Sequence, residues 1–213
     1  MKTILIVILL FVQVPLSALQ GPVELEPSEV RDYEGIDLSS IADFRENSIK
    51  GPQRIDLERY ELRVTGLVVQ QKNLSYAGIL KDFESYRKVV TLNCVEGWNV
   101  TILWEGFLVE DLIGDTEKNA TTVIFHARDG YTTSLPLEYI RNKDIILANR
   151  MNNVTMPAER GFPFQLVAES KWGYKWIKWV DWIEISDDKS YRGYWERRGY
   201  SNEGDLDKRF WGF

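Results

Sequence analysis

The chain has only one cysteine, Cys94, and one histidine, His126, among its 213 residues. A single cysteine excludes folds held together by disulfides and sites built from several cysteines, such as zinc and iron–sulfur centres. A single histidine excludes metal centres built from several imidazoles and argues against a His-based catalytic triad. The fold must therefore rest on a hydrophobic core, and 44% hydrophobic with 27% charged residues is the composition of a folded globular protein.

The N-terminus has the pattern of an export signal. Lys2 precedes an apolar run over residues 4–14, and Pro15 and small residues follow. We expect a signal peptide or an uncleaved N-terminal anchor over residues 1–20, and an extracytoplasmic protein or one anchored to the membrane and facing outside. An exported chain can carry glycans, and the sequence contains more glycosylation sequons than chance predicts, at Asn73, Asn99, Asn119 and Asn153.

Composition divides the rest of the chain into three parts. Residues 21–58 are polar and lack apolar periodicity, so we expect an extended N-terminal arm. Residues 59–190 have the length and patterning of one domain. Residues 191–213 are rich in aromatic and charged side chains, and we expect them to pack on that domain as a tail.

Local patterns predict short strands and helices in irregular order. Alternation from Tyr60 to Val64 predicts a half-buried strand, and Ser75 can cap a helix whose apolar residues extend to Tyr86. Gly106 is interpreted as a turn between a strand and a short helix that ends at Ile113. The other predictions are strands over 88–94, 122–126, 164–168 and 177–185, a turn at 129–130 and a helix over 134–141. Without regular βαβ alternation, the pattern indicates an α+β domain with mixed β-sheets and short helices.

The surroundings of Cys94 decide between three uses of a lone cysteine. It can be a small buried hydrophobe, one partner of an intermolecular disulfide, or a metal ligand. The residue ends a predicted strand and enters a Gly-Trp turn, and functional side chains are common in such loops. Because one thiolate cannot hold a metal alone, the third use requires an organic cofactor that supplies further sulfur ligands.

Residues 94–98 read Cys-Val-Glu-Gly-Trp, and Trp-Glu-Gly-Phe follows at 104–107. This segment resembles the one that ligates molybdenum in the sulfite-oxidase superfamily, and within it most resembles that of the catalytic subunits of exported bacterial protein-methionine-sulfoxide reductases. Residues 159–167 and 172–179 resemble the superfamily's pterin-phosphate loop, and residues 44–51 resemble the part of its N-terminal arm that contacts the pterin. The likeness covers residues 40–186, with the motifs in the order of the superfamily.

The resemblance implies a sulfite-oxidase-type fold and an enzyme with a molybdopterin cofactor that holds molybdenum or tungsten. It implies that Cys94 ligates the metal and that Glu96 and Trp98 line the approach to it. The cofactor-binding residues that it implies, besides Cys94, are Arg45, Asn47, Arg160, Gly173, Tyr174, Lys175 and Lys178. His126 lies in a predicted strand, where it could approach the pterin or be a structural histidine with its own partners. Considered without the resemblance, residues 172–183 also fit an amphipathic edge strand with solvated lysines.

One departure from the superfamily bears on the substrate. Sulfite oxidases have a Gly-Asn-Arg-Arg run after the ligand cysteine, whereas this chain has Glu96 and Trp98 there. A carboxylate about 5 Å from an anionic substrate costs on the order of 1 kcal/mol or more, so sulfite is disfavoured. We expect oxygen-atom transfer that reduces an S- or N-oxide, in a small molecule or bound to a protein.

The partners follow from what the chain lacks and from its charge. No heme or cytochrome segment is visible, so electrons must come from a separate protein, such as a membrane cytochrome. The net charge of −6 and the lack of a basic stripe argue against a nucleic-acid partner, and we expect a monomer. The alternative hypothesis is a secreted glycoprotein that keeps the fold and works as a binding module without the cofactor.

Overall fold

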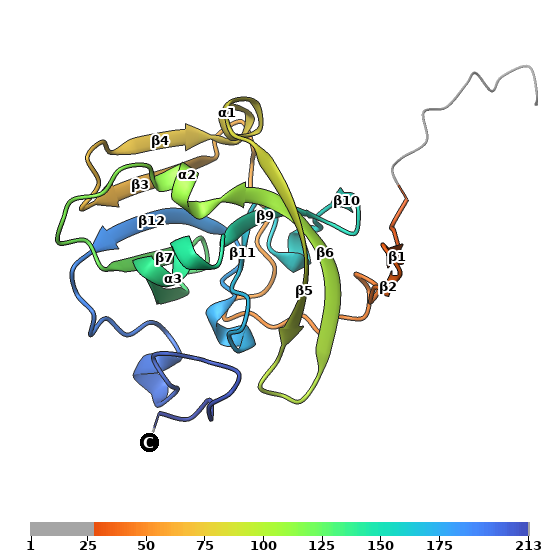
Figure 1. Cartoon of the computed structure of the whole chain (residues 1–213). Helices are drawn as coiled ribbons and strands as arrows, with labels where there is room; N and C mark the ends of the chain where they lie inside the picture. Colours follow the sequence, from red (N-terminus) through yellow and green to blue (C-terminus); the bar gives the residue numbers. More distant parts are fainter. Residues whose placement is uncertain (1–27, 213) are drawn as a thin grey trace, which may run out of the picture.

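The computed structural model describes residues 28–212, and the signal peptide or anchor predicted over residues 1–20 lies outside this range. Two five-stranded β-sheets make up the body of the protein (Figure 1). The first has the order β10-β9-β6-β5, with β11 also paired to β9. Its strands are β5 (Ser85–Asn93), β6 (Asn99–Leu108), β9 (Ile146–Met151), β10 (Val154–Thr155) and β11 (Gln165–Val167).

The second sheet has the order β4-β3-β12-β7-β8. Its strands are β3 (Glu61–Gly66), β4 (Lys72–Ser75), β7 (Thr122–Ala127), β8 (Thr132–Pro136) and β12 (Val180–Ser186). β3 and β12 are parallel, whereas the other described strand pairs are antiparallel. The helices are short: α1 (Tyr76–Asp82), α2 (Val109–Ile113) and α3 (Leu137–Asn142). The predicted α+β fold with mixed sheets and short helices is confirmed.

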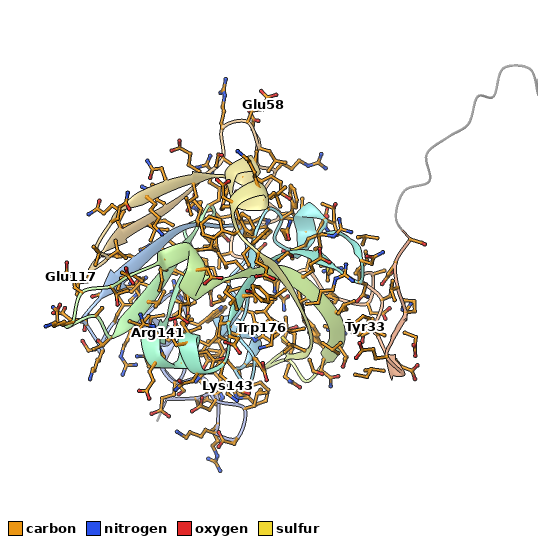
Figure 2. All side chains as sticks on the ribbon, turned by 45° about the horizontal axis from the view of Figure 1, so that its top comes forward. Tyr33, Glu58, Glu117, Arg141, Lys143 and Trp176 are labelled. Atoms are coloured by element: carbon orange, nitrogen blue, oxygen red, sulfur yellow. The ribbon has the colours of Figure 1, made fainter. Side chains whose placement is uncertain are left out.

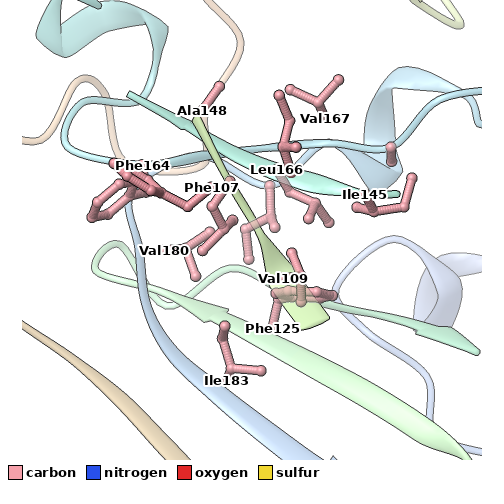
Figure 3. Close-up of a cluster of buried hydrophobic side chains, with 14 of the residues drawn as sticks. Phe107, Val109, Phe125, Ile145, Ala148, Phe164, Leu166, Val167, Val180 and Ile183 are labelled. Carbon is pink, nitrogen blue, oxygen red and sulfur yellow. The ribbon is translucent and has the colours of Figure 1, made fainter. Parts of the chain in front are cut away.

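The hydrophobic core is formed by side chains from both sheets. Phe107 and Phe164 from the first sheet and its flanking loop pack in one cluster with Phe125 and Ile183 from the second (Figure 3). Along β3 the alternation that the sequence shows places Leu62 and Val64 inside, with no exposed surface. Charged side chains such as Glu58 and Glu117 lie at the periphery (Figure 2), and Arg141 is also exposed.

The arm before the domain has little regular structure, and its described part contains only the small β1 (Asp32–Tyr33) and β2 (Ile36–Asp37) hairpin. Among residues 28–212, no helix has both the length and the apolar content needed to cross a membrane.

Several element boundaries differ from the predictions because strand pairing overrides local pattern. Ser75 caps α1 as predicted, with its side chain accepting from the Gly78 amide, but the helix ends at Asp82 because Ser85–Asn93 pairs with β6. The helix predicted from residue 134 begins at Leu137, since the preceding residues belong to β8.

Gly106 is not a turn. β6 continues through it, and a Cβ atom there would lie 2.0 Å from the carbonyl oxygen of Leu147 on β9. The glycine is therefore needed for the close approach of two strands at a β-bulge.

Two further corrections concern β9 and β12. The strand predicted over 177–185 begins at Val180, after a 3₁₀ turn over Gly173–Lys175. β9 was not predicted, because its almost uniformly buried sequence lacks the alternation of a half-buried strand.

Candidate active site

A cavity of about 390 Å³ opens where the arm, the loop after β5 and the Gly173–Lys175 turn meet. This volume is within the range of small-molecule and cofactor sites. Its walls come from segments far apart in the sequence, including the C-terminal tail. The predicted site residues on these walls are Arg45, Asn47, Cys94, Glu96, Trp98, Arg160, Gly173, Tyr174 and Lys178.

Cys94 lies in a closed loop on the cavity wall. Its backbone amide donates to the Trp98 carbonyl at 2.9 Å, and the Gly97 amide donates back to the Cys94 carbonyl at 3.1 Å. Gly97 has a φ of 87°, which glycine adopts without strain and which this tight turn requires. The loop holds Cys94 on the wall with only 8% of the residue's surface exposed.

Opposing interactions act on the pKa of the Cys94 thiol. Burial raises its pKa, and hydrogen bonds to the sulfur from the Glu96 amide and from Asn47 lower it. The Asn47 side-chain nitrogen lies 3.8 Å from the sulfur. Because burial is the largest effect, the free thiol is protonated at neutral pH, and a bound cation is needed to hold it as a thiolate.

Glu96 ties the arm to the Cys94 loop. Its Oε2 accepts from the Trp98 indole at 3.1 Å and from the Asn47 amide at 3.3 Å. The Phe44 ring packs against Trp98 with 6.3 Å between ring centroids. A carboxylate fixed among aromatic and amide groups therefore lies beside the thiol.

Three cationic side chains line the same cavity and differ in what holds them. Arg160 donates through Nε and Nη2 to the carbonyls of Ile41 and Phe44, and so holds the arm. Lys178 pairs with Glu46 at 2.7 Å, while burial lowers its pKa. Arg45 is exposed and makes no hydrogen bond or ion pair with the other described residues.

Gly173 brings the turn after β11 directly against the end of β5. A Cβ atom at this position would lie 3.2 Å from the Asn93 carbonyl oxygen and 3.5 Å from Cys94 Cα. The neighbouring Trp172 forms a parallel bridge with Asn93. The interpretation of 172–183 as an amphipathic edge strand with solvated lysines is therefore wrong: the segment contains a 3₁₀ turn, and β12 is central in its sheet.

Two of the predicted cofactor-binding residues, Lys175 and His126, do not line the cavity. Lys175 has a fully buried side chain, and its ammonium donates to the Ser134 carbonyl at 3.0 Å and to Glu196 at 2.6 Å. His126 lies on β7, where it stacks on Trp182 at 3.8 Å and bonds Glu184 at 3.0 Å. Both side chains already have partners, so we remove them from the proposed cofactor site.

The tail contributes two aromatic residues to the cavity that the sequence did not identify, Trp195 and Tyr200. Partial burial raises the pKa of Tyr200, and the nearby Cys94 and Glu96 raise it further. The tail is visibly aromatic in the sequence, but no local pattern indicates which of its rings turn inward.

The residues present fit the cofactor that the motifs imply. A thiol, three cations and glycine-permitted backbone approach share one cavity of suitable size. A thiolate is a suitable ligand for a metal that the pterin's own sulfurs also hold, and cations suit its phosphate. Within residues 28–212 no group of three or more His, Cys, Asp and Glu side chains is arranged to hold a metal ion.

Comparisons with known proteins agree with this chemistry. The model of the oxidoreductase molybdopterin-binding domain matches residues 49–195. An uncharacterized oxidoreductase, YuiH, of Bacillus subtilis is 32% identical over 157 residues, which are 72% of this chain and 78% of that protein. A solved structure, the sulfane dehydrogenase SoxCD of Paracoccus pantotrophus, has the same fold, with a TM-score of 0.66 at 17% identity over 91% of this chain and 59% of that one.

Two further relatives are named for methionine sulfoxide reduction. The protein-methionine-sulfoxide reductase catalytic subunit MsrP of Gluconobacter oxydans is 28% identical over 60% of this chain and 47% of its own length. A putative reductase subunit, YedZ1, of Azospira oryzae is 30% identical over 70% and 57%. The chain thus spans about half the length of these two relatives. With the family model matching most of the chain, the protein belongs to the sulfite-oxidase family of molybdopterin-binding oxidoreductases and is a molybdenum-cofactor enzyme.

Proposed function

We propose that the protein is an exported oxidoreductase that reduces a neutral S- or N-oxide by oxygen-atom transfer. The observation that supports this proposal is the wall beside Cys94, where the Glu96 carboxylate and the Trp98 indole lie in place of cationic side chains. A fixed negative charge raises the energy of a bound anion such as sulfite and leaves a neutral oxide unaffected.

We propose a role for each of the predicted residues that line the cavity. Cys94 would hold the metal, and the pterin and its phosphate would lie against the arm, the Gly173 turn and the cations. When bound, the cofactor supplies the two-electron redox change and the metal centre for oxygen transfer. The residues proposed for the cofactor are Arg45, Asn47, Arg160, Gly173, Tyr174 and Lys178.

The side chains of this protein would bind and orient the oxide. Phe44, Trp98 and Trp195 offer an apolar surface for the carbon groups on sulfur or nitrogen. The raised pKa of Tyr200 keeps its phenol protonated at neutral pH, so its hydroxyl can donate a hydrogen bond to the oxide oxygen. Asn47 and Trp98 hold the Glu96 carboxylate in place.

The proposal is tested on protein purified from its native host. Elemental analysis should find about one molybdenum or tungsten per chain, since one thiolate lines the cavity. With a reduced dye as electron donor, methyl sulfoxides or amine N-oxides should be consumed, whereas sulfite with an oxidising dye should not. Faster sulfite oxidation than oxide reduction would overturn the proposed direction. Metal-free, colourless native protein would favour the alternative binding module.

Glu96→Gln tests the charge argument. Removing one charge near the substrate should raise kcat/KM for sulfite relative to a neutral sulfoxide by roughly fivefold, equivalent to about 1 kcal/mol. The gain should shrink in 1 M salt, where the Debye length is about 3 Å. Steady-state kinetics at low and high salt measure both effects.

The matched control is Glu105→Gln, which removes a carboxylate of the same type from β6. Glu105 pairs with Arg87 and does not line the cavity. Its substitution should leave the ratio of sulfite to sulfoxide kinetics unchanged. An equal shift in both variants would mean that net charge, and not the site, sets the preference.

We further infer export, the predicted boundaries and a separate electron donor. The signal-like residues 1–20, an arm over 21–58, a domain over 59–190 and a tail over 191–213 remain our proposed division of the chain. The name of the Gluconobacter relative, a catalytic subunit, supports a partner protein, which we propose to be a membrane cytochrome, and a small or protein-bound oxide as substrate. Cell fractionation with N-terminal sequencing tests the export, and intracellular protein with an intact Met1 would contradict it.

A further inference from the structure

Hydrogen bonds and an ion pair hold the C-terminal tail against the segment that contains the Gly173 turn. The Trp172 amide donates to the Gly204 carbonyl at 2.8 Å, and the Tyr174 hydroxyl donates to the Ser201 carbonyl at 2.8 Å. An ion pair joins Lys171 to Asp205. These contacts place the tail beside the turn whose residues Gly173 and Tyr174 line the cavity.

At the centre of this contact is a buried ion pair between Lys175 and Glu196. The Nζ and Oε1 atoms are 2.6 Å apart, and both side chains are fully buried. Lys175 also donates to the Ser134 carbonyl, and the Thr133 hydroxyl donates to the same Glu196 oxygen at 2.7 Å. The pair therefore joins the turn, β8 and the tail at one point.

A gain in folding stability does not by itself explain this pair. Burying two charges costs free energy that their attraction does not always recover, and apolar side chains of similar size often serve as well or better. The second oxygen of Glu196, Oε2, is buried without a hydrogen-bond partner among the described atoms, which adds to the cost. A charged pair instead fixes the position of the tail relative to the turn, because its hydrogen bonds are directional.

Close backbone approach leaves the tail little freedom around the pair. A Cβ atom on Gly193 would lie 2.2 Å from the Thr132 carbonyl oxygen, and one on Gly204 would lie 2.8 Å from Cγ of Lys175. The two cavity-lining aromatic residues of the tail, Trp195 and Tyr200, lie between these two glycines in the chain, and Trp195 directly precedes Glu196.

We propose that the Lys175–Glu196 pair is a positioning device that holds Trp195 and Tyr200 as the outer wall of the active-site cavity. Lys175 then acts on the site through the tail, from a buried position behind the turn. The effect of the pair on the KM for an oxide rests on the proposed function, whereas the effect of the pair on how well the cavity covers Cys94 does not.

The test uses the chain's only cysteine as a reporter of that closure. In the full-length chain produced without cofactor, Glu196→Gln should raise the rate of iodoacetamide labelling of Cys94 about tenfold, because the tail opens locally more often. Glu196→Asp keeps the charge and should fall between Glu196→Gln and the wild type. Labelling is measured well below the thermal transition of each variant.

The loaded enzyme provides the second readout. In Glu196→Gln with wild-type metal content, KM for a neutral oxide should rise about fivefold while kcat changes less than about twofold. The matched control is Glu203→Gln, which removes an exposed tail carboxylate paired with Lys208. It should leave both labelling and kinetics within about twofold of wild type, since exposed pairs contribute little.

Each outcome decides the proposal. A folded Glu196→Gln variant with wild-type labelling of Cys94 would overturn it. If that variant does not fold, Glu196→Asp takes its place, because it keeps the charge and only shortens the side chain; wild-type labelling in Glu196→Asp would also overturn the proposal. Increased labelling in a protein that reduces no oxide would support the positioning role and contradict only the proposed function.

Discussion

Cys94→Ser should lose oxide-reducing turnover by at least about 10³-fold while keeping the fold. A serine hydroxyl is a hard, weakly acidic group and does not replace the thiolate that a thiophilic metal requires. The substitution exchanges one small side chain for another at a position that is 8% exposed, so unfolding free energy should change by about 1 kcal/mol or less. Dye-linked kinetics, metal analysis and thermal unfolding measure the three quantities.

Thr91→Ala is the control for damage to the β5–β6 hairpin. Its hydroxyl bonds Thr101 across the two strands, on the same strand that leads to Cys94 but outside the cavity. This variant should keep its metal and its turnover. If Cys94→Ser retains turnover at the wild-type level, the assignment of the thiol as the metal ligand is wrong.

Gly106→Ala should lower the free energy of unfolding by about 3 kcal/mol or more, the upper range for overpacking in a core. The added carbon would lie 2.0 Å from the Leu147 carbonyl oxygen and 2.5 Å from Ala148 Cα. These are backbone atoms of β9, so relief requires that β6 and β9 separate where they pair. Urea unfolding followed by tryptophan fluorescence measures the loss.

Gly35→Ala separates the steric clash from the general cost of replacing glycine. Gly35 has a φ of 81°, and no atom lies within 4 Å of the position of an added Cβ. Its substitution should cost about 1 kcal/mol, the strain of a left-handed alanine. Equal losses in the two variants would contradict the packing argument at Gly106.

Short-range patterns in the sequence were enough to predict the fold class, whereas the wall around Cys94 was predicted from the resemblance of the motif at 94–98 to the superfamily. The alternation in β3 and the motif at 94–98 are local, so the strand and the loop could be predicted directly. Gly106 looked like a turn because its real constraint is Leu147 on another strand. β9 was missed because both of its faces are buried.

The errors within the site have the same origin. Lys175 and Lys178 are three residues apart in one motif, yet only Lys178 reaches the cavity. The difference is Glu196, whose position beside Lys175 depends on the course of the tail and not on any local pattern. His126 likewise has its partners on β12, some 58 residues away at Glu184. Pairings over such distances require the folded structure.

The order in which the chain leaves the ribosome has a consequence for the formation of the cavity. β3 has its parallel partner in β12, and the Tyr60 hydroxyl donates to the Val180 carbonyl 120 residues later. The cavity is completed only when Trp195 and Tyr200 take their places. A nascent chain therefore has no finished pocket before Tyr200 has been synthesised, and long-range pairing of this kind is slow. The complete pocket is thus a product of late, long-range folding and not of any segment that can fold on its own as it is synthesised.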